Sequence, residues 1–320
     1  MQQSTLRHLV LNSAIPRMLR VHFRCDDILF WVRIAIIAAP VLALAGCTNL
    51  SLAIANAPTA FDDLGVHRDV QYAEASKSQV LDLYVPKDKD QPHPVVMFLH
   101  GGGWTSGSKN QYRFVAEALL GRGYVVVVPG YRLYPETRFP GFIEDAAQAV
   151  AWTQAHVAEF GGDPDRLFLM GHSAGAHIAA MLNFDEKYLR EAGLDRSVIK
   201  GFIGLAGPYD FLPLRSRTLQ KVFAPEERYA DSQPVNFVDG EEPPALLLHG
   251  LADFTVGSYN SKHLAARIRQ VGGKVEEHYY DGMSHGGVLA AVSVYFRNRR
   301  SVLDEIGEFV EREGYSVVMK

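Results

Sequence analysis

Cysteine is scarce in this chain, and the usual metal-binding spacings are missing. Its 320 residues include two cysteines, Cys25 and Cys47. The sequence contains neither a Cys-x-x-Cys pair nor a His-Glu-x-x-His run. These absences exclude a disulfide-rich fold and leave no sequence signal for a zinc site. We therefore expect the hydrophobic core to hold the fold together, and we expect the chemistry to require no metal and no organic cofactor.

Strong charge and repetition are also lacking. The formal net charge is −4, which gives no basis for nucleic-acid binding. No internal repeat or low-complexity linker interrupts the sequence. What is present is an alternation of strand-like and helical patterns, which is typical of an α/β fold with a mostly parallel sheet. We expect strands over 94–99, 124–128, 167–170, 199–205, 244–248 and 275–280, and helices over 141–160, 174–182, 262–271 and 301–312.

A Gly-x-Ser-x-Gly motif is centred on Ser173. It follows the apolar run 167–170 and precedes the small-residue pattern 174–182, which predicts a tight corner between a strand and a helix. A serine at such a corner takes a strained backbone conformation, and glycine at positions 171 and 175 leaves room for the close approach of strand and helix. The motif therefore predicts that Ser173 is a nucleophile.

A glycine-rich loop follows the first expected buried strand. It reads His-Gly-Gly-Gly-Trp, from His100 to Trp104. In hydrolases with a serine at this kind of corner, backbone N–H groups of such a loop and of the residue after the serine bind the developing oxyanion. Gly102, Gly103 and Ala174 are therefore the candidate oxyanion-hole residues. His100 and Trp104 are expected to brace the loop by hydrogen bonding or packing.

A catalytic carboxylate is expected after the serine, in a loop that follows a strand of the sheet. Asp253 meets both conditions, because it lies just beyond the strand-like run 244–248. Asp210 is the alternative, since it also follows a strand-like run. Asp145 and Asp163 precede the serine. We interpret Asp145 as a helix residue and Asp163 as a turn residue before a proline.

The catalytic base is expected last in the chain, and His285 occupies that place. It follows the strand-like run 275–280 and would reach the same edge of the sheet as the serine and the acid. In the predicted mechanism, Ser173 attacks a carbonyl carbon while His285 accepts its proton and Asp253 orients the imidazole. An acyl-enzyme forms, and water activated by His285 then releases the acid.

The remaining candidate histidines are assigned other roles. His249 ends an expected strand and is predicted to face the packed core. His172 and His177 flank the serine motif and are candidates for lining the pocket, although neither fits the expected order of the catalytic residues. His263 and His278 lie in an expected helix and an expected strand, and no chemical step is assigned to them.

Taken together, these motifs resemble the serine carboxylesterases of the α/β-hydrolase superfamily, in the branch that includes bacterial esterases, lipases and kynurenine formamidases. The resemblance implies the α/β-hydrolase fold and hydrolysis of small carboxylic esters. Kynurenine formamidases share the form of the glycine loop, so the alternative is hydrolysis of an arylformamide. A non-catalytic binding module is a further alternative. The segments that carry the resemblance are LDLYVP at 81–86, HGGGW at 100–104, YRLYPE at 131–136, GGDP at 161–164 and GHSAG at 171–175, with His249, Gly250, Asp253 and His285.

The N-terminal region resembles a bacterial lipoprotein signal. An apolar run over 34–46 ends in Leu-Ala-Gly-Cys at Cys47, which would be lipidated as the first mature residue. The run is shorter than the roughly 20 residues that span a bilayer. The alternative is a retained membrane anchor extended back through 28–32, which would have to bury Arg33. Arg17, Arg20, Arg24 and Arg33 are among the basic residues before the run.

This resemblance implies an exported protein that is lipid-anchored on the periplasmic side, with Thr48 favouring the outer membrane. Removal of the signal segment 1–46 leaves 274 residues, which are enough for one large α/β domain over 47–320. The formal charge then becomes −7, because five arginines and two aspartates are lost. Within the domain, 208–243 lacks a regular pattern. It is expected either to pass over the active site or to form a surface loop with its own small cluster. The motifs specify neither the acyl-chain length nor the oligomeric state.

Overall fold

A computed structural model describes residues 56, 65–88, 90–293 and 302–315 of the chain. The chain divides into two units, 1–50 and 51–320, and the described residues belong to the second. The expected signal segment 1–46 and the lipidation site Cys47 lie outside the described residues. In the part that the structure describes, no helix is both long enough and apolar enough to cross a membrane.

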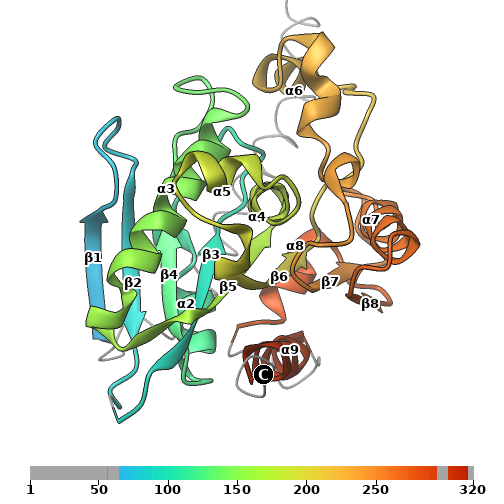
Figure 1. Ribbon diagram of the computed structural model, residues 1–320. Coiled ribbons are helices and arrows are strands. Elements are labelled where there is room, and N and C mark those ends of the chain that lie inside the picture. The colour runs from blue at the N-terminus through green and yellow to red at the C-terminus, as the bar shows by residue number, and fades with distance from the viewer. Residues whose placement is uncertain (1–55, 57–64, 89, 294–301, 316–320) are drawn as a thin grey trace, which may run out of the picture. The chain divides into compact units, whose positions relative to one another are not determined.

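The core of the second unit is an eight-stranded sheet with the spatial order β1-β2-β4-β3-β5-β6-β7-β8 (Figure 1). β1 and β2 join antiparallel to each other, and β2 joins antiparallel to β4, whereas every later pair is parallel. The mostly parallel sheet predicted from the sequence is therefore confirmed. The strands are β1 (Gly65–Gln71), β2 (Val80–Val85), β3 (His93–Leu99), β4 (Val125–Pro129), β5 (Gly162–His172), β6 (Ile199–Leu205), β7 (Ala245–Gly250) and β8 (Val275–Tyr280).

Helices cover both faces of this sheet, which explains why its central strands read as continuous apolar runs. All five residues of β4 are buried. Side chains alternate between two hydrophobic clusters. One contains Val95 and Met97 with residues of α3, α4 and α7, and the other contains Val96 and Phe98 with residues of α2, α8 and α9. The helices are α2 (Arg113–Leu120), α3 (Gly141–His156), α4 (Ala174–Phe184), α5 (Lys187–Glu191), α6 (Arg217–Val222), α7 (Tyr259–Gln270), α8 (His285–Ala290) and α9 (Val302–Tyr315).

Several expected boundaries differ from the structure. The helix predicted over 141–160 ends at His156 as α3. Its last four residues form the tighter 3-10 turn Val157–Phe160 instead. That turn is closed by Gly161 at φ 80°, a conformation that glycine adopts without steric cost. The helix expected to start at residue 262 begins at Tyr259. The strand expected over 167–170 is the centre of the longer β5.

The parallel register gathers the loops that follow the strands at one edge. Leu99 of β3 pairs with Gly171 of β5, and His172 of β5 pairs with Leu205 of β6. The carboxyl ends of neighbouring parallel strands therefore lie side by side, and the loops that leave them meet above that edge. The glycine loop, the Ser173 corner, and the loops that carry Asp253 and His285 all follow such strands.

Candidate active site

The corner between β5 and α4 has the backbone geometry that the motif predicts. Ser173 has φ 56° and ψ −122°, a conformation that a residue with a side chain rarely adopts. Its N–H donates to the carbonyl of Leu205 at 2.9 Å, so the neighbouring strand β6 helps to hold the strained residue. Strain of this kind persists only where the surroundings enforce it, and here it turns the hydroxyl out of the corner.

The glycines on either side of Ser173 are required by close backbone contacts. A Cβ on Gly171 would overlap the carbonyl of Gly175, and a Cβ on Gly175 would overlap the carbonyls of Leu99 and His100. Strand β5, helix α4 and the end of β3 therefore approach each other more closely than any side chain permits. This contact also fixes the start of the glycine loop beside the serine.

Ser173, His285 and Asp253 form a continuous hydrogen-bonded chain. The Oγ of Ser173 lies 2.9 Å from Nε2 of His285, and Nδ1 of His285 lies 2.7 Å from Oδ2 of Asp253. A carboxylate only accepts hydrogen bonds, so Nδ1 carries the proton and donates it to Asp253. Nε2 is then free to accept the proton of the Ser173 hydroxyl, which is the arrangement that activates a serine nucleophile.

Asp253 is held by four groups and is nearly inaccessible to solvent, with 6% of the residue exposed. Its Oδ1 accepts from the N–H groups of Thr255 (2.9 Å) and Val256 (2.8 Å), while Oδ2 faces His285 and also His249, whose Nε2 lies 3.3 Å away. Burial raises the pKa of Asp253, but these hydrogen bonds lower it by more, so the net pKa is well below its usual range. The carboxylate therefore stays ionised beside the imidazole.

His249 has a role that was not predicted from the sequence. Its Nε2 donates to the carbonyl of Val256 at 2.9 Å, and its Nδ1 lies 2.8 Å from the Oγ of Ser261. The ring is fully buried and packs as expected. However, it also fixes the loop that carries Asp253. The spacing of four residues between His249 and Asp253, just after a strand, was the available signal for this contact.

The alternative acids lie elsewhere. Asp210 is bonded to Nδ1 of His263 at 2.7 Å, and both side chains are substantially exposed. Asp145 is fully buried in α3 and receives hydrogen bonds from Arg132 and from the amide of Gln79. Neither carboxylate contacts the His285 ring, so Asp253 is the acid that the structure brings to Ser173 and His285.

The glycine loop lies against the serine corner. A Cβ on Gly101 would come within 3.3 Å of the Cβ of Ser173. Gly102, at φ 131°, begins a tight turn in which its carbonyl accepts from the N–H groups of Thr105 and Ser106. In the described part of the chain, no acceptor contacts the N–H groups of Gly102 and Gly103. These donors are therefore available to a bound oxyanion.

The two histidines that flank the motif do not line the pocket, so that prediction was wrong. His172 donates from Nε2 to the carbonyl of His285 at 3.1 Å, and it thereby positions the loop that carries His285. Burial, together with the nearby His285, lowers the pKa of His172 to about 3. The ring of His177 lies behind Trp104, with their ring centroids 5.1 Å apart. Side chains on the inner turn of α4 face the core, which the sequence spacing alone did not reveal.

His177 joins the glycine loop to the 208–243 segment. Its Nε2 donates to the carbonyl of Ser232 at 2.8 Å, and its Nδ1 accepts from the indole N–H of Trp104 at 3.3 Å. The bond from Trp104 requires the neutral ring, because a protonated Nδ1 cannot accept. Burial lowers the pKa of His177 to about 4, in keeping with this requirement. The residue therefore positions Trp104, and through it the glycine loop.

We expect the His177→Gln variant to be less sensitive to acid than the wild-type protein. The pKa of His177 is lower in the folded state than in the unfolded state. Between about pH 6.5 and pH 4 the imidazole is therefore protonated in the unfolded chain and neutral in the folded chain. The stability that depends on the neutral ring is complete above pH 6.5 and is lost as the pH falls toward 4. One such group contributes about 1.4 kcal/mol per pH unit to the slope. Urea unfolding at several pH values between 7 and 4.5 gives the free energy of unfolding at each pH. Its slope against pH should be shallower in the variant than in the wild-type protein.

The matched control for this experiment is His67→Gln, which makes the same change at an exposed position. Glutamine can still donate to Ser232 and accept from Trp104, so the variant at 177 should remain folded. Equal slopes for wild type and His177→Gln would contradict the prediction.

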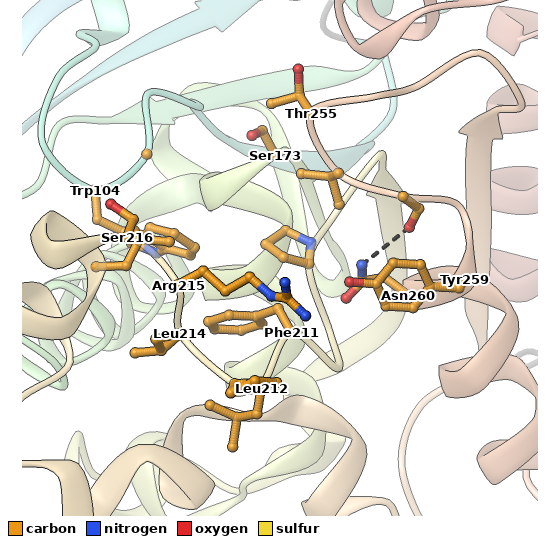
Figure 2. A pocket seen from close by; sticks show the side chains of 16 residues that line it. Trp104, Ser173, Phe211, Leu212, Leu214, Arg215, Ser216, Thr255, Tyr259 and Asn260 are labelled. Carbon is orange, nitrogen blue, oxygen red and sulfur yellow. Dashed lines mark hydrogen bonds between the residues drawn. The ribbon is translucent and has the colours of Figure 1, made fainter.

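A pocket opens next to Ser173. Its cavity volume is about 480 Å³, within the range of small-molecule sites. Figure 2 shows Ser173 on one wall, with Trp104 and Phe211 across from the Thr255 loop. The 208–243 segment contributes much of the apolar wall. The pocket is lined by Gly103, Trp104, Ser173, Pro208, Phe211, Leu212, Pro213, Leu214, Arg215, Ser216, Leu219, Thr255, Val256, Gly257, Tyr259 and Asn260.

No metal-binding cluster accompanies this pocket in the part of the chain that the structure describes. Those residues contain no group of three or more histidine, cysteine, aspartate or glutamate side chains arranged to hold an ion. The groups available for chemistry near Ser173 are the imidazole of His285, the carboxylate of Asp253 and the backbone N–H donors of the glycine loop.

Sequence comparisons find relatives that are named as esterases. The BD-FAE family model matches residues 81–268. The chain is 32% identical over 242 residues to isoprenylcysteine alpha-carbonyl methylesterase ICME of Arabidopsis thaliana, covering 69% of this chain and 56% of that protein. It is 32% identical over 226 residues to esterase LipC of Mycobacterium tuberculosis, covering 64% of this chain and 56% of that protein. The chain spans about half the length of the curated relatives it matches.

Solved structures confirm the expected α/β-hydrolase fold. Esterase 2 of Thermogutta terrifontis with bound butyrate superposes with a TM-score of 0.65 at 25% identity, covering 78% of this chain and 95% of that chain. Esterase B of Lactobacillus rhamnosis superposes with a TM-score of 0.73 at 20% identity, covering 88% of this chain and 96% of that chain. The second likeness concerns the fold alone.

Proposed function

Because this chain belongs to the BD-FAE family, we propose that it hydrolyses small carboxylic esters, with Ser173 as nucleophile, His285 as base and Asp253 orienting the base. The observation that carries the proposal is the hydrogen-bonded chain from Ser173 Oγ through His285 to Asp253 beside an apolar pocket. The esterase names of the relatives support an ester as the bond that is cleaved.

The proposed reaction begins when Ser173 Oγ attacks the ester carbonyl carbon. His285 Nε2 accepts the hydroxyl proton, and Asp253 stabilises the resulting imidazolium through Nδ1. The carbonyl oxygen becomes an oxyanion. The tetrahedral intermediate collapses as His285 returns the proton to the leaving alcohol, which produces an acyl-enzyme. Water then attacks the acyl carbon, with His285 again accepting the proton, and the carboxylic acid is released.

The oxyanion is proposed to bind the N–H groups of Gly102, Gly103 and Ala174. Ala174 is the first residue of α4, so its N–H has no partner within the helix. The positive end of the helix adds to the stabilisation of negative charge at this point. Donors that are already aimed at the oxyanion need no reorganisation during the reaction, which is the usual source of large rate enhancements.

Turnover by the full chain tests the proposal directly. We expect hydrolysis of p-nitrophenyl acetate and butyrate. We also expect a single phosphoryl adduct on Ser173 after treatment with diethyl p-nitrophenyl phosphate, located by peptide mass spectrometry. N-formylkynurenine belongs in the same panel, because its preferential cleavage would replace the ester by an arylformamide. Absence of turnover, or an adduct on another residue, would overturn the proposal.

We also propose that the mature protein is exported and anchored by a lipid on Cys47, on the periplasmic side of a bacterial membrane and with sorting to the outer membrane. Cysteine at the end of the Leu-Ala-Gly-Cys motif supports this proposal, and Thr48 supports the sorting. In a bacterial host, we expect wild-type protein to incorporate labelled palmitate and the Cys47→Ser variant to incorporate none, since serine lacks the thiol that is acylated. Cys25→Ser is the matched control and should retain the label. Equal labelling of Cys47→Ser and wild type would contradict the anchor.

A further inference from the structure

Among the described residues that line the pocket, Arg215 is the only charged one. The other lining residues are apolar, glycine or uncharged polar residues, and no aspartate or glutamate lies among them. A single cation in an otherwise uncharged pocket makes the local potential positive. The pocket therefore favours a ligand that carries negative charge.

The guanidinium of Arg215 has no carboxylate partner among the described residues. Asp210, five residues earlier, is bonded to His263 instead. Some other arginines of the described chain, including Arg196 and Arg269, are paired with carboxylates. The five N–H donors of Arg215 are thus available to a ligand.

Asn260, the amide side chain in the pocket lining, does not compete for this role. The amide oxygen of Asn260 already accepts from the N–H groups of Tyr209 and Asp210, both at 2.9 Å. Its amide nitrogen donates to the carbonyl of Gly257 at 3.1 Å, which is the dashed line in Figure 2. Asn260 therefore holds the pocket wall in place, and its polar atoms are already used.

The pocket is graded from an apolar interior to an exposed rim. Trp104 and Leu214 are 4% and 7% exposed, whereas Leu212 and Tyr259 are 39% and 50% exposed. Arg215 is also exposed, and Figure 2 shows its side chain extended from its loop toward Tyr259 and Asn260. A substrate that reaches from Ser173 to the rim passes apolar walls before it meets the guanidinium.

We propose that Arg215 selects esters that carry a carboxylate separated by an apolar spacer from the ester bond that is cleaved. The inference rests on the proposed esterase function and names its substrate class. A guanidinium binds a carboxylate through two parallel hydrogen bonds. The apolar side chains between Ser173 and the rim accept the spacer.

The test compares substrates that differ only in a carboxylate or its isosteric primary amide. One series has the group on the acyl side: monoethyl succinate, adipate and suberate, each against the corresponding monoamide. The second series has the group on the alcohol side. It consists of acetyl esters of ω-hydroxy acids, each compared with the acetyl ester of the corresponding ω-hydroxy amide. The readout is the ratio of kcat/KM for carboxylate over amide, measured with full-length protein. At the best spacer length in one series, we expect a ratio of about ten in wild type.

The Arg215→Gln variant should reduce that ratio to about one, because glutamine is uncharged and cannot form the two parallel hydrogen bonds of a guanidinium with a carboxylate. Arg217→Gln is the matched control. Arg217 is an exposed arginine at the start of α6 that does not line the pocket, and its variant should keep the wild-type ratio. Raising the salt concentration to 0.5 M should lower the wild-type ratio, since an exposed ion pair is screened.

The outcomes separate this inference from the proposed function. A ratio near one in wild type for both series, or a ratio that survives in Arg215→Gln, overturns the role of Arg215 while leaving ester hydrolysis intact. If the wild-type protein cleaves none of the esters, neither those with a carboxylate nor those with a primary amide, the proposed function is overturned and the inference with it. A preference lost in Arg215→Gln but kept in Arg217→Gln supports the inference.

Discussion

The Ser173→Ala variant is expected to lose ester hydrolysis, with kcat lowered by about 10⁴-fold or more. Alanine removes the hydroxyl that is bonded to His285 Nε2, so no acyl-enzyme can form on residue 173. Residual turnover would come from direct attack of water on the ester, with the N–H donors stabilising the oxyanion that forms. Substrate binding relies on the pocket walls, so KM should change far less than kcat. Stopped-flow and steady-state assays with p-nitrophenyl butyrate measure both quantities.

Ser197→Ala is the matched control for this variant. Ser197 is an exposed residue in the turn before β6, and its replacement should leave kcat at the wild-type value. Circular dichroism of Ser173→Ala should be unchanged, because alanine keeps the same backbone and loses one oxygen atom. A Ser173→Ala protein with more than a few per cent of wild-type kcat would show that another residue is the nucleophile.

Much of this site could be predicted from the sequence because its determinants are local. The corner at Ser173 is specified by two glycines whose missing Cβ atoms permit the contact of β5 with α4 and the end of β3. Asp253 and His285 could be assigned because each follows a strand of a parallel sheet, and such strands end at one common edge. Chain order excluded Asp145 and Asp163, and the structure separates Asp253 from Asp210 because Asp210 is bonded to His263.

Other features could not be predicted, because they depend on contacts between distant segments. The antiparallel β1 and β2 at one end of the sheet have no signature that fixes their place in the strand order. Arg215 lies in a segment without regular periodicity, and only the folded chain brings it to the pocket beside Ser173. The direction of the His177 side chain likewise follows from the packing of α4 against Trp104, which no local pattern records.

The 208–243 segment shows how such contacts connect the pocket to the catalytic loops. Phe211 lines the pocket and lies with its ring centroid 5.9 Å from that of Trp104, and Phe223 packs against the same indole at 4.9 Å. Ser232 accepts the hydrogen bond of His177, which in turn accepts from Trp104. Changes in this segment therefore reach the glycine loop through Trp104, so the proposed substrate pocket and the proposed oxyanion donors share one set of aromatic contacts.

The Asp253→Asn variant is expected to lower kcat by about 10³- to 10⁴-fold while the protein remains folded. The N–H groups of Thr255 and Val256 both donate to Oδ1, so the amide oxygen of asparagine must take that place. The amide NH₂ is then forced into the position of Oδ2, where it faces Nδ1 of His285. An NH₂ group donates, so Nδ1 must become the acceptor.

The imidazole of His285 would therefore carry its proton on Nε2, and it could no longer accept the proton of Ser173. Nitrogen-15 NMR of the imidazole distinguishes the two tautomers directly, and we expect the Nδ1-protonated form in wild type and the Nε2-protonated form in Asp253→Asn. Asp210→Asn is the matched control, since Asp210 is bonded to His263 at the surface. Its kcat should equal that of wild type. If Asp253→Asn retained the Nδ1-protonated tautomer and a near-normal kcat, Asp253 would not be the residue that orients the base.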